Sequence, residues 1–106
     1  MKNLLLITFL FTSSILFSQT MEVKIKSSIQ CEMCSENITD ALYLLKGVKS
    51  IKINLEDQLI KVKYNSKKMN IEKIEESITK IGYDANNRKA NQEVYQNLPY
   101  CCQKPE

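Results

Sequence analysis

The sequence of 106 residues predicts an α+β fold: a ferredoxin-like sandwich of order β-α-β-β-α-β, with two helices on one face of an antiparallel sheet. Three observations predict it. Several short segments alternate apolar and polar residues, which is typical of half-buried strands. Two other segments place apolar residues three or four positions apart, which is typical of amphipathic helices. Polar breaks separate these segments, and their apolar positions suffice for one small core.

The first half of this order follows from a change of period along the chain. Apolar residues alternate with lysines over residues 22–27, which predicts a strand. A loop over residues 28–34 precedes a helical apolar stripe over residues 35–46. Gly47 follows directly, and glycine just past a helix end is a common stop. Residues 48–55 alternate again and are expected to form the second strand.

The second half begins with a polar break. Residues 56–58 suit a hairpin turn, and residues 59–64 alternate as the third strand. Asn70 is a good helix N-cap and precedes an amphipathic pattern over residues 71–81, which a glycine ends. Residues 83–85 are expected to form a short last strand. This strand would complete the sheet.

The N-terminal 18 residues have the layout of a secretory signal peptide: Lys2 is followed by an apolar run and then by small residues. The run is shorter than the ~20 residues that a membrane-spanning helix needs, and no later segment could span a membrane. We therefore expect a signal peptide at 1–18, one domain at 19–87 and a C-terminal tail at 88–106. Within this tail, residues 91–98 are expected to form a short helix. The mature protein is expected to be periplasmic or secreted.

Composition narrows the function. The formal net charge of +3 gives no argument for a nucleic-acid partner. The absence of histidine removes the usual general base and the commonest nitrogen ligand for zinc or copper(II). With only two glycines, the chain lacks a loop that could cradle a phosphate. No feature supports a hydrolase or a transferase, so we do not expect an enzyme.

Cys31 and Cys34 have C-x-x-C spacing at the junction of the first strand and the first helix. This spacing lets both sulfurs turn toward one point, and the free N–H groups of a helix N-terminus favour thiolates, the form that binds metal. Soft thiolates select copper(I), mercury(II), zinc and cadmium. Two ligands suffice for linear copper(I) or mercury(II), whereas structural zinc usually takes four. With no histidine in the chain, a two-cysteine site is therefore expected to prefer these softer, low-coordinate ions, copper(I) or mercury(II).

The motif alone is also compatible with a redox dithiol or with a structural disulfide. Glu32 and Met33 stand between the cysteines, in place of the Gly-Pro pair common in thioredoxin-like proteins. An acidic Glu32 beside the thiols also disfavours a thiolate. Both intervening side chains are interpreted as solvent-exposed groups and not as ligands. A thiol-disulfide redox protein remains the alternative function.

Cys101 and Cys102 stand in the polar tail, where three interpretations are open. The tail could fold back and add thiolates to the first pair, form a disulfide, or carry an independent, flexible thiol pair. Return of the tail is favoured, because Tyr95, Leu98 and Tyr100 give it apolar surface with which to dock. Both cysteines are therefore possible additional metal ligands.

Several of these features occur together: the C-x-x-C after the first strand, the helix with Leu42 and Leu45, Gly47-Val48, and Ile-Gly-Tyr-Asp-Ala over residues 81–85. Together they resemble a heavy-metal-associated domain over residues 22–86. That family includes copper chaperones, N-terminal domains of metal-pumping P-type ATPases and a periplasmic mercuric-ion carrier. The resemblance implies a reversible carrier of copper(I) or mercury(II). It also implies ligand exchange with a partner such as a metal-transporting P-type ATPase.

The sequence departs from the family just before its first cysteine. The family usually has Gly-Met-Thr there, and this chain has Ser28, Ile29 and Gln30. The resemblance implies that Ile29 takes the place of the family methionine, which packs into the core and is not a ligand. Tyr83 matches a tyrosine that lies near the metal loop of bacterial copper chaperones, although simple core packing explains it equally well.

Overall fold

The computed structural model describes residues 19–104 and confirms the α+β class. The elements are β1 (Thr20–Lys26), α2 (Glu32–Tyr43), β2 (Val48–Asn54), β3 (Leu59–Asn65), α3 (Ile71–Lys80), α4 (Gln92–Gln96) and the 3₁₀-helix η2 (Tyr100–Cys102). The predicted signal peptide at 1–18 lies outside the described residues. Within residues 19–104, no helix is both long and apolar enough to cross a membrane.

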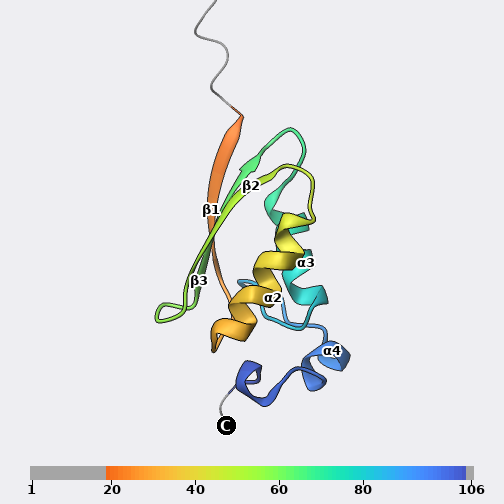
Figure 1. Ribbon diagram of the computed structural model, residues 1–106. Helices are drawn as coiled ribbons and strands as arrows, with labels where there is room; N and C mark the ends of the chain where they lie inside the picture. The colour runs from red at the N-terminus through yellow and green to blue at the C-terminus, as the bar shows by residue number, and fades with distance from the viewer. Residues whose placement is uncertain (1–18, 105–106) are drawn as a thin grey trace, which may run out of the picture.

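The three strands form an antiparallel sheet of order β1-β3-β2. In its register, Ile60 of β3 lies opposite both Ile25 of β1 and Ile53 of β2. One face of the sheet is therefore apolar, while Lys61 and its neighbours occupy the other. Helices α2 and α3 lie side by side over one face (Figure 1).

The predicted apolar stripes form the core. Ile38 and Leu42 of α2 and Ile74 and Ile78 of α3 are all fully buried. Burying a side chain of this size stabilises the fold by roughly 1.5–3 kcal/mol. The two helices are therefore fixed against the sheet by packing, and the chain at their ends is held in place as a consequence.

The expected last strand is wrong. Ala85 makes an isolated bridge to Ser27, and no further ladder forms along residues 83–85. Asn86 interrupts the ladder: its side-chain Oδ1 accepts a hydrogen bond from the Lys26 N–H, at 3.0 Å, where a strand would offer a backbone carbonyl. With a φ of 53°, Asn86 also turns the chain away. The described residues thus contain three strands, and the segment after α3 borders β1 without joining the sheet.

The first helix begins earlier than predicted. Cys31 is the N-cap residue, with extended backbone, and its carbonyl accepts the N–H of Ser35 at 3.2 Å. This bond starts the helical ladder at Glu32 and not at Ser35. Cys34 therefore belongs to the first turn of α2 and not to a loop.

Both glycines have a positive φ, 96° at Gly47 and 104° at Gly82. Gly82 directly follows Ile81, the C-cap of α3, and is confirmed as the stop of that helix. The expected stop at Gly47 is wrong, because α2 already ends at Tyr43 with Leu44 as its C-cap, and Gly47 instead turns the chain into β2. A Cβ at Gly47 would lie 2.8 Å from the Lys68 Cβ. A Cβ at Gly82 would lie 3.2 Å from side-chain atoms of Leu98 and Val94. Gly82 therefore does more than end α3, because it admits the C-terminal tail against the core.

Candidate metal centre

The connection between β1 and α2 is held by side chains from distant parts of the chain. The Ser28 hydroxyl accepts the Asp84 N–H at 3.0 Å, and the Gln58 amide donates to the Ile29 carbonyl at 2.9 Å. Ile29 is fully buried, which fits the packing role inferred for it. These contacts fix the backbone immediately before Cys31.

Cys31 and Cys34 lie at the start of α2 with their Sγ atoms 3.4 Å apart. Cys31 is half-buried, and Cys34 is fully buried against the core. Between them, Glu32 is exposed and Met33 is 48% exposed. Both side chains therefore face solvent, as the sequence predicted. The pair is thus one accessible and one shielded thiol at a helix N-terminus.

The C-terminal tail folds back toward this pair. Asn91 caps α4, its Oδ1 accepting the Val94 N–H at 3.2 Å, and Leu98 packs against the core cluster. After Pro99, η2 carries the next residues to the beginning of α2, as Figure 1 shows. Lys104 then forms an ion pair with Asp84. The tail is therefore anchored on both sides of its cysteines.

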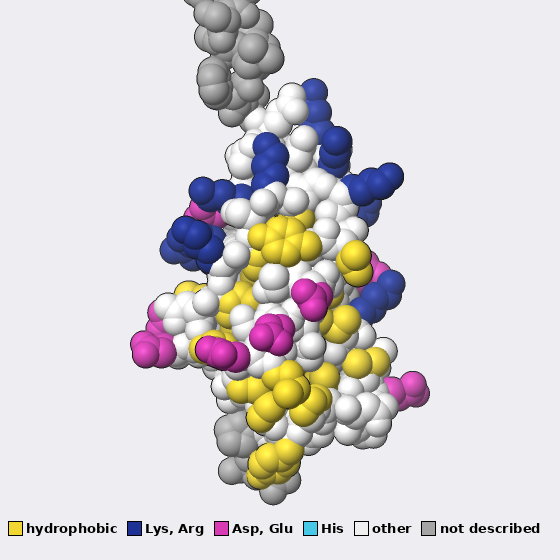
Figure 2. Space-filling model, viewed as in Figure 1, with side chains coloured by type: hydrophobic (Ala, Val, Ile, Leu, Met, Phe, Trp, Pro, Cys, Tyr) yellow, Lys and Arg dark blue, Asp and Glu magenta, His cyan; other side chains and the backbone are white. Residues whose placement is uncertain are grey.

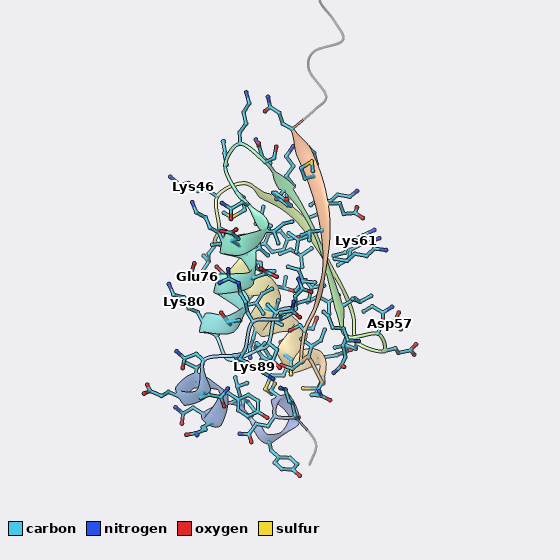
Figure 3. The ribbon with its side chains drawn as sticks, turned by 180° about the vertical axis from the view of Figure 1, so that it is seen from behind. Lys46, Asp57, Lys61, Glu76, Lys80 and Lys89 are labelled. Carbon is cyan, nitrogen blue, oxygen red and sulfur yellow. The ribbon has the colours of Figure 1, made fainter. Side chains whose placement is uncertain are left out.

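As a result the Cys31 Sγ has the sulfurs of the other three cysteines around it, in the region between the start of α2 and η2 where Figure 3 shows yellow sulfurs. The Cys31 Sγ lies 2.8 Å from that of Cys101 and 3.8 Å from that of Cys102. The sulfurs of these three residues all lie within 4.8 Å of one another. All four cysteines are free thiols. Of the three interpretations that the sequence left open for the tail, this arrangement matches its return to the first pair.

The thiols differ in acidity. A hydrogen bond with Cys101, and next the Cys34 backbone N–H, lower the pKa of Cys31 to about 7, against an opposing effect of burial. Burial first, and then its interaction with Cys34, raise the pKa of Cys102. Near neutral pH Cys31 is thus more readily a thiolate than either tail cysteine, whose pKa values are raised, and thiolates are the form that binds soft metals.

Tyr83 lies between the core and the cysteines. Its side chain is fully buried, and its hydroxyl accepts a hydrogen bond from the Asn37 amide at 3.2 Å. Burial, followed by interaction with Cys102, raises its pKa. The two roles considered for this tyrosine therefore coincide, because it fills the core and also borders a tail cysteine.

Asp84 is a positioning residue that the sequence analysis did not single out. Its backbone N–H holds Ser28, and its carboxylate accepts the Ala90 N–H at 2.9 Å and pairs with Lys104. Burial alone would raise the pKa of Asp84, but Lys104 and the Ala90 N–H lower it. Asp84 thereby links the loop before Cys31 to the tail. In the sequence, only its place in the Ile-Gly-Tyr-Asp-Ala segment distinguished Asp84 from other acidic residues.

Acidic and basic side chains are separated along one face of the molecule. On the face shown in Figure 2, apolar and acidic side chains gather toward the end with the cysteines, and lysines toward the other. Glu32, Glu36 and Asp40 are exposed on α2, four residues apart, and therefore form one acidic stripe. Tyr100 belongs to η2, which contacts α2, and its side chain is 94% exposed.

Comparison with known proteins gives consistent matches. The profile of the heavy-metal-associated domain matches residues 24–84. The copper chaperone CopZ of Staphylococcus epidermidis is 38% identical over 56 residues, which is 53% of this chain and 82% of that protein. CopZ of Staphylococcus haemolyticus is 30% identical over 56 residues, with the same coverage of 53% and 82%. The family profile ends at residue 84, so α4 and η2 lie beyond the residues that it matches.

Solved structures agree on the fold. A CopZ metallochaperone superposes with a TM-score of 0.60 at 26% identity, covering 61% of this chain and 98% of that one. Oxidised MerP from Ralstonia metallidurans CH34 superposes with a TM-score of 0.61 at 19% identity, covering 63% and 94%. At 19% identity, the similarity to MerP is evidence for the fold only. That fold is the ferredoxin-like arrangement of two helices on an antiparallel sheet.

Proposed function

This chain belongs to the heavy-metal-associated domain family, and on that premise we propose that it is an exported carrier of a soft metal ion, held by the thiolates of Cys31 and Cys34. The observation that carries the proposal is the 3.4 Å separation of their Sγ atoms at the N-terminus of α2. The similarity to copper chaperones supports copper(I) as the cargo.

The pair suits reversible binding. Copper(I) and mercury(II) are stable with two sulfur ligands, so a third thiolate can approach before either bond breaks. Zinc and cadmium prefer more ligands, which makes them weaker candidates for a two-cysteine site. Cys31 is half-buried, whereas Cys34 is fully buried, so Cys31 is where an incoming ligand would meet the ion.

The partner that we propose is a metal-handling protein, with a metal-transporting P-type ATPase foremost. One structure with the same fold is the N-terminal domain of a potential copper-translocating P-type ATPase from Bacillus subtilis, in its Cu(I)-loaded state, at 24% identity and a TM-score of 0.60. The acidic stripe of α2 beside Cys31 favours a basic docking surface on the partner.

Export is proposed from the leader at residues 1–18 alone. It implies a periplasmic or secreted protein that begins near Gln19. N-terminal sequencing of the protein recovered from the periplasm or the medium checks this. An intact Met1 on cytoplasmic protein would exclude it.

The alternative function is a thiol-disulfide redox protein. The observation that favours it is the lowered pKa of Cys31, since a thiolate near neutrality is also the attacking group in thiol exchange. The chain departs from thioredoxin-like proteins both in its Glu32-Met33 pair and in its fold. Reductase activity on a disulfide substrate would support this alternative.

A competition titration of the reduced chain with copper(I) against a copper(I) chelator tests the carrier function. The wild type is expected to compete for one ion. The variant Cys31→Ser/Cys34→Ser is expected to lose most of this affinity. Undiminished affinity in the variant would remove the C-x-x-C pair from the site, and turnover of a disulfide without metal binding would point to the alternative.

A further inference from the structure

We propose that Cys101 and Cys102 complete the metal site, so that the ion held by Cys31 and Cys34 gains at least one further sulfur ligand from the tail. This inference rests on the proposed function and extends it. The matched domain ends at residue 84, so the tail cysteines are a feature of this chain beyond the domain. They would convert an open two-thiolate site into a closed one.

The sulfur positions suit a shared ion. A metal–sulfur bond of about 2.3 Å places two sulfurs of a tetrahedral site about 3.8 Å apart. Cys31 lies 3.4 Å from Cys34 and 3.8 Å from Cys102, sulfur to sulfur. The 2.8 Å between Cys31 and Cys101 is shorter than that spacing. Because Cys101 is exposed, its side chain has room to move outward by the ~1 Å required.

Contacts that do not involve sulfur hold the tail in this position. Leu98 packs over Gly82 so closely that a Cβ added at Gly82 would lie 3.2 Å from the Leu98 side chain. Lys104 pairs with Asp84, and the Lys104 N–H donates to the Tyr95 hydroxyl at 2.7 Å. These anchors flank the two cysteines. The tail is therefore docked before a metal arrives, which lowers the entropic cost of adding its thiolates.

Cys102 is the better placed of the two tail ligands. It is fully buried, as is Cys34, and the two side chains interact. A thiolate already beside the ion has a high effective concentration compared with a thiolate from another molecule. The tail therefore occupies the position that a partner's thiolate needs, and transfer requires its displacement. The chain would retain its ion more firmly than an open carrier.

The test compares the full-length reduced chain with Cys101→Ser/Cys102→Ser, and with Tyr100→Ser as a matched control. The control changes an exposed tail side chain next to the cysteines and removes no sulfur. X-ray absorption on copper(I)-loaded protein counts the sulfur ligands, and competition with a chelator gives the affinity. We expect at least three sulfurs in the wild type and the control. We expect two in the double variant, with copper(I) held about 100-fold less tightly.

Two sulfurs in the wild type, with equal affinity in the double variant, would overturn the inference and leave the Cys31–Cys34 carrier intact. Full affinity in Cys31→Ser/Cys34→Ser would instead overturn the proposed function and this inference with it. If the double variant fails to fold, Cys101→Ser alone replaces it, because that side chain is exposed. Loss of a sulfur ligand or of affinity then supports the tail, and two sulfurs in both the wild type and Cys101→Ser overturn the inference.

Discussion

Cys31 and Cys102 are 71 positions apart in the chain, yet their Sγ atoms lie 3.8 Å apart. Cys31 is fixed as the N-cap of α2, and Cys102 is carried there by a tail that packs against the end of α3. The metal centre is therefore assembled from two segments. Its geometry depends on docking of the tail as well as on the C-x-x-C motif.

Gly82 is the first point at which this dependence can be tested. In Gly82→Ala, a Cβ meets Leu98 and Val94 in a backbone conformation with φ of 104°, so the tail must shift. We expect a loss of about 1–3 kcal/mol in the free energy of unfolding, together with faster alkylation of Cys102. Urea unfolding and mass-mapped alkylation measure the two effects.

Gly47→Ala is the matched control for that substitution. It imposes similar backbone strain, at φ of 96°, and its Cβ meets Lys68, away from the tail. It is expected to lower stability without changing the reactivity of Cys102 below the unfolding transition. Equal protection of Cys102 in wild type and Gly82→Ala would show that the tail does not depend on this packing.

The acidity of Cys31 predicts a pH profile for its alkylation. The lowered pKa means that the reactive thiolate persists down to about pH 7, whereas an ordinary thiol would require a pH near 9.0. Cys101→Ser is expected to raise the midpoint, because the contact with Cys101 is the largest cause of the shift. Rates of iodoacetamide labelling at Cys31, followed by mass spectrometry, give the profile. A wild-type midpoint near 9.0 would contradict it.

The ion pair between Asp84 and Lys104 predicts that acid loosens the tail. Because the pKa of Asp84 is lowered on folding, its contribution to stability is present above the ordinary value of 3.8 and is lost as the pH falls through the lowered value. In Asp84→Asn the tail is expected to be loosened already at neutral pH, so that the backbone amide of Cys102 exchanges faster than in the wild type. Amide exchange of Cys102, measured by NMR, reports it.

Glu93→Gln provides the comparison for the acid effect. It removes an equal charge from the exposed surface of α4, and Glu93 forms no ion pair within residues 19–104. Its amide exchange at Cys102 should remain that of the wild type. If Asp84→Asn and Glu93→Gln behave alike, the pairing with Lys104 does not anchor the tail.

The two cysteines of the motif are expected to differ in their effect on stability. Cys34→Ser puts a hydroxyl into a fully buried site, and an unsatisfied buried hydroxyl costs about 1–3 kcal/mol. Cys31→Ser changes a half-buried side chain and should stay within about 0.5 kcal/mol of the wild type. Thermal unfolding of the metal-free proteins compares them. Equal stability would mean that the core accommodates the hydroxyl.

The core could be predicted from the sequence because periodicity reports burial directly. Ile38 and Leu42 on α2, and Ile74 and Ile78 on α3, all lie where the helical stripes placed them. The start of α2 could not be predicted, since it depends on the Cys31 carbonyl entering the helical ladder. Short polar segments at a helix boundary carry no period.

Long-range polar contacts explain the remaining differences. The last expected strand is prevented by Asn86, whose amide side chain bonds to Lys26, 60 positions away. The apolar residues of the tail indicated that it could dock, but the pairing of Asp84 with Lys104 left no local signal. The division at residue 87 between domain and tail stays a prediction, although the two pack together within the described residues.

Native mass spectrometry of the reduced chain tests the central claim most directly. The protein is offered copper(I) and zinc together and is compared with Cys31→Ser/Cys34→Ser at the same concentration. The account predicts that the wild-type chain carries copper(I) in preference to zinc. It also predicts that the variant loses this copper. An equal copper load on both proteins, or a preference for zinc in the wild type, would contradict it.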